Sequence, residues 1–238
     1  MDIASNLKQI REDVQSISLG CGRAPESVDI LAVSKTFPAR AVEEAWRGGQ
    51  NLFGENRVQE AEEKIPLVAQ GVSQASGLGP QACSWHLIGH LQSNKARRAV
   101  EMFDVIQSLD SEKIIRRLGG YAGEYGKQLG VYIQVNIGGE SQKHGIHPSE
   151  TLAMAELVNS LSHLNLLGLM TIPPYFEDAE KSRPYYRQMQ ELLDEVNGCL
   201  PDPLTGLSMG MSHDYSVAIQ EGATLLRIGT AIFGRRRD

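Results

Sequence analysis

The stretch GLSMGMSHDYSVAIQEGATLLRIGTAIFG, residues 206–234, decides the fold. Its apolar runs at 206–210 and 224–229 flank a segment at 213–221 whose apolar residues recur at helical spacing. A strand, a helix and a second strand in this order indicate a βαβ unit with parallel strands. TAIFG, at the end of the stretch, then begins a further helical segment.

Six more apolar runs alternate with helical patterns towards the start of the chain. The runs lie at 29–34, 51–55, 84–89, 103–109, 130–137 and 165–171. The helical patterns lie at 39–48, 56–65, 93–101, 111–127, 148–161 and 178–197. Eight strands alternating with helices over 238 residues predict an α/β protein, a single (β/α)8 barrel, which typically takes about 250 residues. A doubly wound open sheet is the competing arrangement.

Two segments lie outside this alternation. Residues 3–17 carry apolar side chains at helical spacing, so an extra amphipathic helix is predicted to open the chain and to end near Gly20. The uncharged segment GVSQASGLGPQACS (71–84) is predicted to be a surface loop, with a lid over the site as a second interpretation. No repeat or linker divides the sequence, so we expect one domain over residues 1–238.

The composition disfavours several classes of partner and site. The chain has 23 Lys and Arg against 29 Asp and Glu, a net charge of −6, so we expect no nucleic-acid binding, which depends on phosphate contacts. Cys21, Cys83 and Cys199 are widely spaced and suggest neither a disulfide framework nor a zinc site. The charged N-terminus and the lack of a long apolar run predict a cytoplasmic protein without a membrane span.

Lys35 is the first candidate for chemistry. In a parallel barrel, functional groups gather where strands end and the following loops begin. Lys35 directly follows the apolar run ILAVS (30–34), so its stem is predicted to lie against apolar walls at the barrel mouth. Burial of an amine lowers its pKa and frees its lone pair to attack a carbonyl group. An exposed lysine at a strand end is the alternative interpretation.

The last two strands end in turns suited to phosphate. Gly210 and Ser212 follow the seventh predicted strand, and Gly229 and Thr230 follow the eighth. Small residues, hydroxyl groups and free backbone N–H groups bind phosphate, and barrels frequently hold phosphate after these two strands. Ser212 is also predicted to cap the helix that begins at His213, a role compatible with phosphate binding.

Arg227 interrupts the apolar strand TLLRIG. A buried guanidinium is costly unless it is paired, so Arg227 is expected to reach a carboxylate such as Glu55 or to face a cofactor ring.

The histidines do not indicate a metal. His86 and His90 are four residues apart, but they straddle a strand end and lack a third ligand nearby in sequence. We therefore expect them to make polar or packing contacts and predict no metal site. His144 and His147 are expected to be solvated.

Eight motifs in this order resemble those of the pyridoxal phosphate homeostasis proteins, relatives of the barrel domain of alanine racemase. They are AVSKT (32–36), FGENRVQE (53–60), WHLIGHLQSNK (85–95), SLDS (108–111), QVN (134–136), ESQKHG (140–145), GLMTIPP (168–174) and SMGMSHDYSVAIQEGATLLRIGTAIFGRR (208–236). The resemblance covers nearly the whole chain and is highly specific. It implies a (β/α)8 barrel that binds pyridoxal 5′-phosphate (PLP) at its C-terminal mouth.

The resemblance also implies roles for individual residues. Lys35 would form the Schiff base with PLP, and three residues would bind its phosphate: Ser212, Gly229 and Thr230. Arg227 would face the pyridine nitrogen, while Asn56 and His86 would lie close to the cofactor. The family often has an aromatic residue where this chain has Arg57, so the lining of the mouth is expected to differ there.

The function that the resemblance implies is that of a PLP carrier that supplies apo-enzymes as transient clients. We expect it to be non-catalytic and, because no second domain is expected through which it could dimerise, monomeric. The alternative is a PLP-dependent amino-acid racemase-like enzyme. Racemisation needs a base on each face of the cofactor, and alanine racemase-like enzymes draw one from a second domain that we do not expect here after Asp238. A Schiff-base aldolase would use the same lysine and phosphate loops, but the full set of motifs disfavours it.

Overall fold

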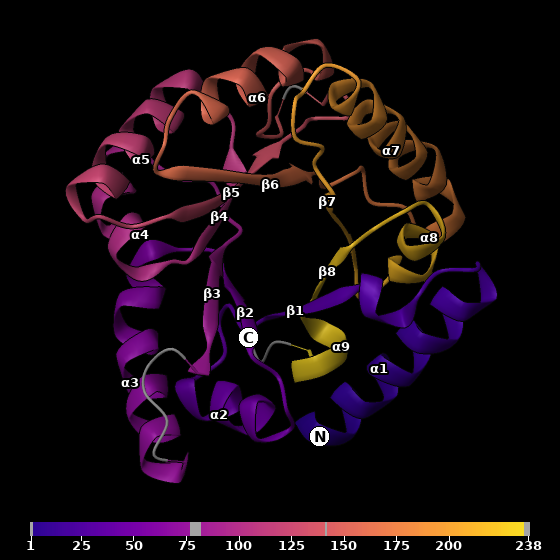
Figure 1. Ribbon diagram of the computed structural model, residues 1–238. Helices are drawn as coiled ribbons and strands as arrows, with labels where there is room; N and C mark the ends of the chain where they lie inside the picture. Colours follow the sequence, from indigo (N-terminus) through magenta and orange to yellow (C-terminus); the bar gives the residue numbers. More distant parts are fainter. Residues whose placement is uncertain (1, 77–81, 141, 236–238) are drawn as a thin grey trace.

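The computed structural model describes residues 2–76, 82–140 and 142–235, and its strands form a closed parallel barrel in sequential order (Figure 1). The first and last strands close the ring through the register Asp29–Leu225 to Ala32–Ile228. The predicted (β/α)8 barrel is confirmed, and the open-sheet alternative is wrong. The strands are β1 (Asp29–Val33), β2 (Leu52–Glu55), β3 (Ser84–Leu87), β4 (Val105–Leu109), β5 (Leu129–Gln134), β6 (Leu164–Met170), β7 (Gly206–Met211) and β8 (Leu225–Ile228).

Helices surround the barrel on its outside (Figure 1). They are α2 (Ala39–Arg47), α3 (Val58–Ser76), α4 (Ala96–Met102), α5 (Glu112–Glu124), α6 (Thr151–Asn159), α7 (Arg183–Asn197), α8 (Tyr215–Gln220) and α9 (Thr230–Phe233). In α7 the buried residues Tyr186, Met189, Leu193 and Val196 recur three or four positions apart. Such an apolar stripe turns one side of a helix towards the barrel wall and leaves the other to solvent.

The extra N-terminal helix is confirmed as α1 (Ile3–Gly20), and it completes the outer ring. Its buried residues are Ile3, Leu7, Ile10, Val14 and Ser18, four of which are apolar. Figure 1 shows α1 beside the short helices α8 and α9. Asn6 donates to the backbone oxygen of Ile232 in α9, and Tyr215 of α8 donates to Asp13. The helix therefore covers the part of the wall that α8 and α9 are too short to cover.

The prediction of a loop over 71–84 is wrong for residues 71–76. Helix α3 continues to Ser76, and 77–81 lie outside the described residues. Val68 and Val72 are both buried and lie four residues apart, so the inward stripe of the helix extends past the predicted end. The absence of charge in this segment suggests a loop, but its apolar spacing is helical.

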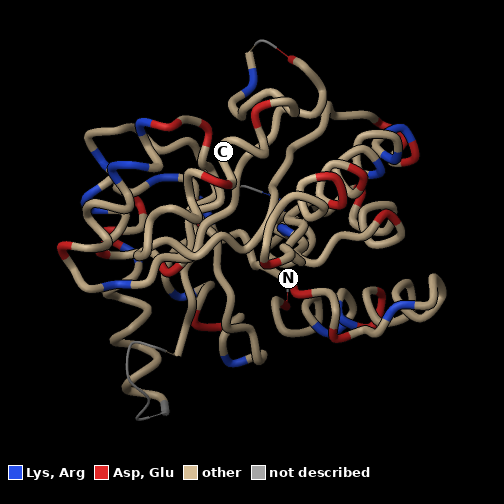
Figure 2. The backbone as a smooth tube through the Cα atoms, turned by 45° about the horizontal axis from the view of Figure 1, so that its top comes forward, with Lys and Arg blue, Asp and Glu red and all other residues tan. Residues whose placement is uncertain are grey.

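The outer surface mixes charges of both signs. Figure 2 shows Lys and Arg interspersed with Asp and Glu along the outer helices, while the barrel strands are largely uncharged. Within the described residues, no helix combines the length and the apolar character needed to cross a bilayer.

Candidate functional site

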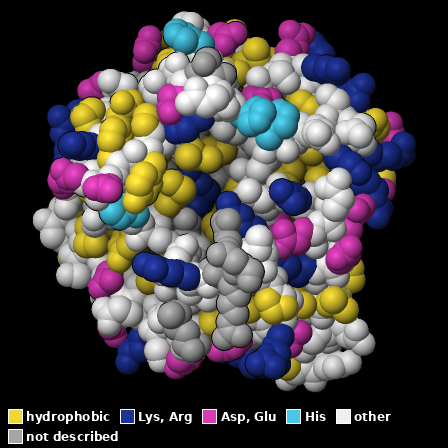
Figure 3. Space-filling model, turned by 180° about the vertical axis from the view of Figure 1, so that it is seen from behind, with side chains coloured by type: hydrophobic (Ala, Val, Ile, Leu, Met, Phe, Trp, Pro, Cys, Tyr) yellow, Lys and Arg dark blue, Asp and Glu magenta, His cyan; other side chains and the backbone are white. Residues whose placement is uncertain are grey.

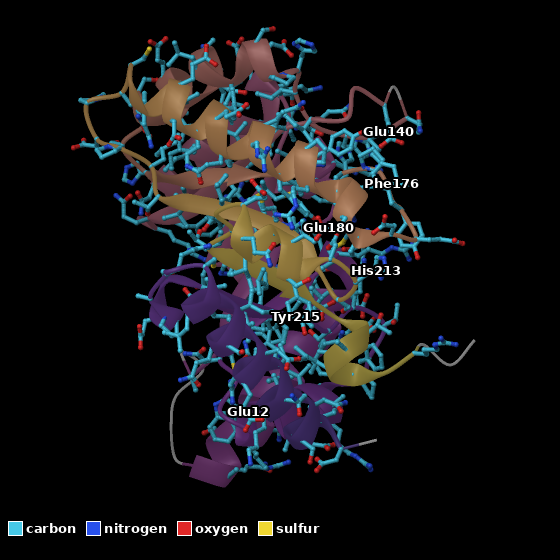
Figure 4. All side chains as sticks on the ribbon, turned by 90° about the vertical axis from the view of Figure 1, so that its right-hand side faces the viewer. Glu12, Glu140, Phe176, Glu180, His213 and Tyr215 are labelled. Atoms are coloured by element: carbon cyan, nitrogen blue, oxygen red, sulfur yellow. The ribbon has the colours of Figure 1, made fainter. Side chains whose placement is uncertain are left out.

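A cavity of about 610 Å³ opens at the carboxyl end of the barrel. Six of the seven residues predicted to bind cofactor line it: Lys35, Asn56, Ser212, Arg227, Gly229 and Thr230. Figure 4 views the barrel from the side, with Glu140, Phe176 and His213, from the loops after β5, β6 and β7, towards the same end. Figure 3 looks onto this end, where Lys, Arg and His side chains gather around a hollow. The structure therefore brings six of the seven predicted residues together in the lining of one cavity.

Lys35 lies half-buried in the cavity wall, two residues after the end of β1. Its Nζ donates to Oδ1 of Asn56 at 3.3 Å, and Asn56 directly follows β2. Two neighbouring strand ends thus bring the amine and the amide together, as the motif positions predicted. Val33 and Phe37 supply apolar wall on the same side of the cavity.

The backbone that presents Lys35 is strained at the next residue. Thr36 has φ of 70°, a conformation that is unusual for a β-branched residue and costs about 1–3 kcal/mol. Its N–H donates to Oε1 of Glu60 at 2.5 Å. Lys64 Nζ in turn donates to the same Glu60 oxygen at 2.7 Å and to the Ser34 carbonyl oxygen at 2.8 Å. Helix α3 therefore holds the backbone on both sides of Lys35.

Lys64 also forms a buried ion pair with Glu55. Glu55 Oε1 accepts from Lys64 Nζ and from Ser34 Oγ, both at 2.7 Å. Burial raises the pKa of Glu55, and the hydrogen bonds from Lys64 and Ser34 oppose that rise. The predicted pairing of Glu55 with Arg227 is wrong, because Lys64 occupies the carboxylate. The sequence motifs did not reveal this role of Lys64; the spacing of Glu60 and Lys64 by one helical turn was the available signal.

Ser212 connects the two loops predicted to bind phosphate. Its Oγ accepts the N–H of Ala231 at 3.2 Å, which links the end of β7 to α9 after β8. Its predicted role as the cap of a helix beginning at His213 is wrong. Instead, the Met211 N–H donates to Asp214 Oδ1 at 2.8 Å, and α8 begins at Tyr215.

Gly210 allows β7 to approach α8 closely before this turn. Its φ is +90°, and an added Cβ would lie 2.5 Å from Cβ of Ala218. A larger residue would therefore displace the helix or the loop that carries Ser212.

Arg227 contributes a buried cation to the cavity wall. Its side chain is 4% exposed, and it donates to Ser208 Oγ and to the Thr171 carbonyl oxygen, both at 2.7 Å. Among the described residues, no carboxylate forms a salt bridge with it. Burial lowers the pKa of Arg227 to about 10, so the group stays charged at neutral pH. A charged donor held by neutral oxygens can still attract an acceptor or a negative group of a ligand.

His86 is the predicted site residue that does not line the cavity. Its Nδ1 is 2.8 Å from Nε2 of Gln107, and Gln107 Oε1 accepts from Ser208 Oγ at 2.6 Å. Because Arg227 can only donate, Ser208 Oγ accepts from Arg227 and donates to Gln107, and Gln107 Nε2 donates to His86. This row of hydrogen bonds therefore runs in one direction and ends at His86 Nδ1. Burial lowers the pKa of His86 to about 4, so the ring is neutral at pH 7. His86 is placed to support Arg227 from inside the barrel.

Several residues of the cavity rim were not predicted. Lys143 lines the cavity, donates to the Pro173 carbonyl oxygen at 3.0 Å and pairs with Glu140. His144, which the sequence predicts to be solvated, stacks on His90 with ring centroids 3.8 Å apart. These residues lie on loops, where contacts depend on the closed barrel more than on local sequence pattern.

Arg57, the departure from the family pattern, is exposed beside the main cavity. With Asn56 and His90 it lines a second, more polar hollow of about 590 Å³. Arg57 is not one of the described residues that line the main cavity.

Comparison with known proteins gives consistent matches over the full chain. The family described as "Alanine racemase, N-terminal domain" matches residues 5–237. A "Pyridoxal phosphate homeostasis protein" of Pasteurella multocida is 43% identical over 237 residues, 99% of this chain and 98% of that protein. PipY of Synechococcus elongatus, solved without PLP, has a TM-score of 0.83 at 39% identity and covers 98% of this chain and 100% of its own. PipY with PLP bound has a TM-score of 0.82 at 38% identity and the same coverage.

The low pKa of His86 predicts a pH dependence of stability. Between pH 6.5 and 4 the unfolded chain binds a proton at this histidine and the folded chain does not, so stability is lost as the pH falls. Between pH 7 and pH 4 the free energy of unfolding of the wild type should fall by about 3 kcal/mol more than that of His86→Gln. Urea denaturation at a series of pH values measures the difference.

His147→Gln, which removes an exposed histidine that caps the short helix Pro148–Glu150, is the matched control, and its free energy of unfolding should change with pH as that of the wild type does. If the free energies of unfolding of the wild type and of His86→Gln fall equally as the pH falls, burial does not exclude the proton from His86.

Proposed function

The chain belongs to the alanine racemase N-terminal domain family and, within it, to the pyridoxal phosphate homeostasis proteins, and on that premise we propose that it holds PLP as a Schiff base on Lys35 and supplies the cofactor to other proteins. One observation carries the proposal: six residues from the ends of β1, β2, β7 and β8 line a single cavity. In this proposal residues 1–238 form one PLP-binding domain.

The residues present fit the chemical groups of PLP. The cofactor has an aldehyde, a phosphate and a pyridine nitrogen, and the cavity offers a lysine amine, two hydroxyl groups and a guanidinium. Its volume of about 610 Å³ lies within the range of about 300–1,000 Å³ that is usual for small-molecule sites. PipY, a relative that is 38% identical to this chain, has PLP bound in its solved structure, which supports the same cofactor here.

Each anchor has a distinct task in this proposal. Lys35 is the point of covalent attachment, and Asn56 orients its amine by accepting a hydrogen bond. The hydroxyl groups of Ser212 and Thr230 and the backbone at Gly229 receive the phosphate. Arg227 faces the ring nitrogen, with His86 as a supporting residue outside the cavity.

In this proposal Arg227 favours binding of the cofactor over catalysis on its ring. Bound PLP supplies a ring that withdraws electrons most strongly when its nitrogen is protonated. A guanidinium has only donors, so it disfavours a proton on a ring nitrogen that it faces. The name of the P. multocida relative supports the same role in cofactor homeostasis. A racemase-like enzyme is the second candidate, because the matching family is that of a racemase domain.

Attachment of PLP through Lys35 predicts a specific labelling result. The full-length protein with PLP should show visible absorbance, and reduction with borohydride should fix the cofactor to the peptide that contains Lys35. Lys35→Ala should lose both signals because the attacking amine is gone. Peptide mapping by mass spectrometry identifies the lysine.

Lys143→Ala is the matched control, because Lys143 lines the same cavity and is absent from the proposed attachment. If the label is lost in Lys143→Ala and persists in Lys35→Ala, the assignment of Lys35 is refuted.

The phosphate assignment predicts a loss of affinity. Each hydrogen bond to a charged group contributes about 1.5–3 kcal/mol, so Ser212→Ala combined with Thr230→Ala should weaken PLP binding by roughly 100-fold or more. Equilibrium titration followed by visible absorbance measures the dissociation constant. Ser216→Ala, on α8 and away from the cavity lining, is the control and should bind as the wild type does. Unchanged affinity in the double variant would rule out these hydroxyl groups as phosphate ligands.

The carrier role predicts transfer without turnover. PLP-loaded protein should restore activity to a defined apo-enzyme, and the rate should be compared with release of PLP into solution. Free amino acids should keep their configuration, as followed by chiral chromatography. Racemisation at roughly 1 per second or more would favour the racemase-like alternative.

A further inference from the structure

Three side chains from separate loops meet at the rim of the cavity. His90 follows β3, Asp110 follows β4, and His144 lies in the loop after β5. Asp110 Oδ2 is 3.0 Å from Nδ1 of His90 and 3.7 Å from Nδ1 of His144. One ligand atom from each residue lies within 4.8 Å of the other two. The three loops thus converge on one point, although their residues are far apart in sequence.

The donor set is that of a transition-metal site. Imidazole nitrogen and carboxylate oxygen are common ligands of Zn²⁺, with bonds of about 2.0–2.2 Å. Tetrahedral bonds of that length place neighbouring ligand atoms roughly 3.3–3.5 Å apart. The two distances to Asp110 Oδ2, 3.0 and 3.7 Å, lie on either side of that spacing. The two separations from Asp110 therefore need little change, although the histidine rings must turn before both nitrogen atoms can face one ion.

We propose that His90, Asp110 and His144 bind a divalent transition-metal ion of the Zn²⁺ type, with a fourth position open at the cavity. Both histidines line the cavity, so a ligand held there has access to the ion. Three protein ligands with one open position is the arrangement of zinc sites that bind a further ligand. The proposal goes beyond PLP binding and does not depend on it.

Binding requires the two stacked rings to separate. The rings lie 3.8 Å apart and 8° from parallel, so their Nδ1 lone pairs lie in different planes. His144 is 57% exposed, which gives its ring room to tilt, whereas Asp110 is only 11% exposed and stays fixed between the loops. The ion replaces the hydrogen that His90 Nδ1 shares with Asp110 in the metal-free arrangement, whereas His144 Nδ1 lies 3.7 Å from Asp110 and makes no such bond. His144 is therefore the ligand that moves.

The test uses Zn²⁺ and Co²⁺ alone with PLP-free, full-length protein. The background carries Cys21→Ser and Cys199→Ser, because these exposed thiols would bind zinc themselves. Calorimetry should show one Zn²⁺ per chain, and Co²⁺ should give the visible bands of a nitrogen and oxygen site. Asp110→Asn and His144→Gln should each weaken binding by roughly 10-fold or more, because loss of a residue that only orients a metal ligand already costs about 10–100-fold. Circular dichroism checks the fold of each variant, and His90→Gln gives a third test of the site.

His213→Gln is the matched control, because His213 lines the same cavity outside the cluster. It should bind Zn²⁺ as the background protein does. Lys35→Ala should also keep the metal site, so failure of the PLP assignment and failure of the metal site are distinguishable. Absence of Zn²⁺ binding, or binding that survives both Asp110→Asn and His144→Gln, would overturn the proposal.

Discussion

The buried guanidinium of Arg227 constrains the inside of the barrel more than any other group. A cation removed from water costs several kcal/mol unless acceptors surround it. The barrel meets this cost with neutral oxygens, because Ser208 Oγ and the Thr171 carbonyl oxygen accept its hydrogen bonds. Ser208 in turn requires an acceptor, which Gln107 provides, and Gln107 requires His86. Polar residues on β3, β4 and β7 therefore replace the apolar side chains that usually fill a barrel of this size.

A second buried cation, Lys64, is stabilised in a different way. It pairs with two carboxylates, those of Glu55 and Glu60, at 2.7 Å each. Its charge is thus neutralised within the protein, and its hydrogen bonds hold the backbone around Lys35. Arg227 lacks such a carboxylate among the described residues, so its charge remains available at the cavity wall. The structure therefore separates a cation that positions the backbone from one that lines the cavity.

Sequence predicted the strands and several residues of the cavity lining because both depend on local pattern. Apolar runs bounded by turns locate β1 to β8 to within a few residues, and Lys35, Ser212, Gly229 and Thr230 follow from where strands end. The cluster of His90, Asp110 and His144 was not predicted because its three residues are remote from one another in sequence. Asp110 is 20 residues from His90, and their contact depends on the pairing of β3 with β4. The partner of Ser212 was missed for the same reason, since Ala231 approaches it only when β7 and β8 pair.

Under the proposed function, the arrangement that suits the cavity for binding PLP would make it poorly suited to chemistry on the ring. Arg227 has only N–H donors, so the hydrogen bonds that run from it through Ser208 and Gln107 all point in one direction and end at His86 Nδ1. Reversing that direction would require His86 to give up its role as acceptor, and burial keeps its ring neutral with Nδ1 free to accept. If the ring nitrogen of PLP faces Arg227, as proposed, it meets a group that can only donate, which would weaken the ability of the ring to withdraw electrons. In the proposed role, one buried network would give both firm binding and weak activation of the ring, a combination suited to storing a reactive cofactor.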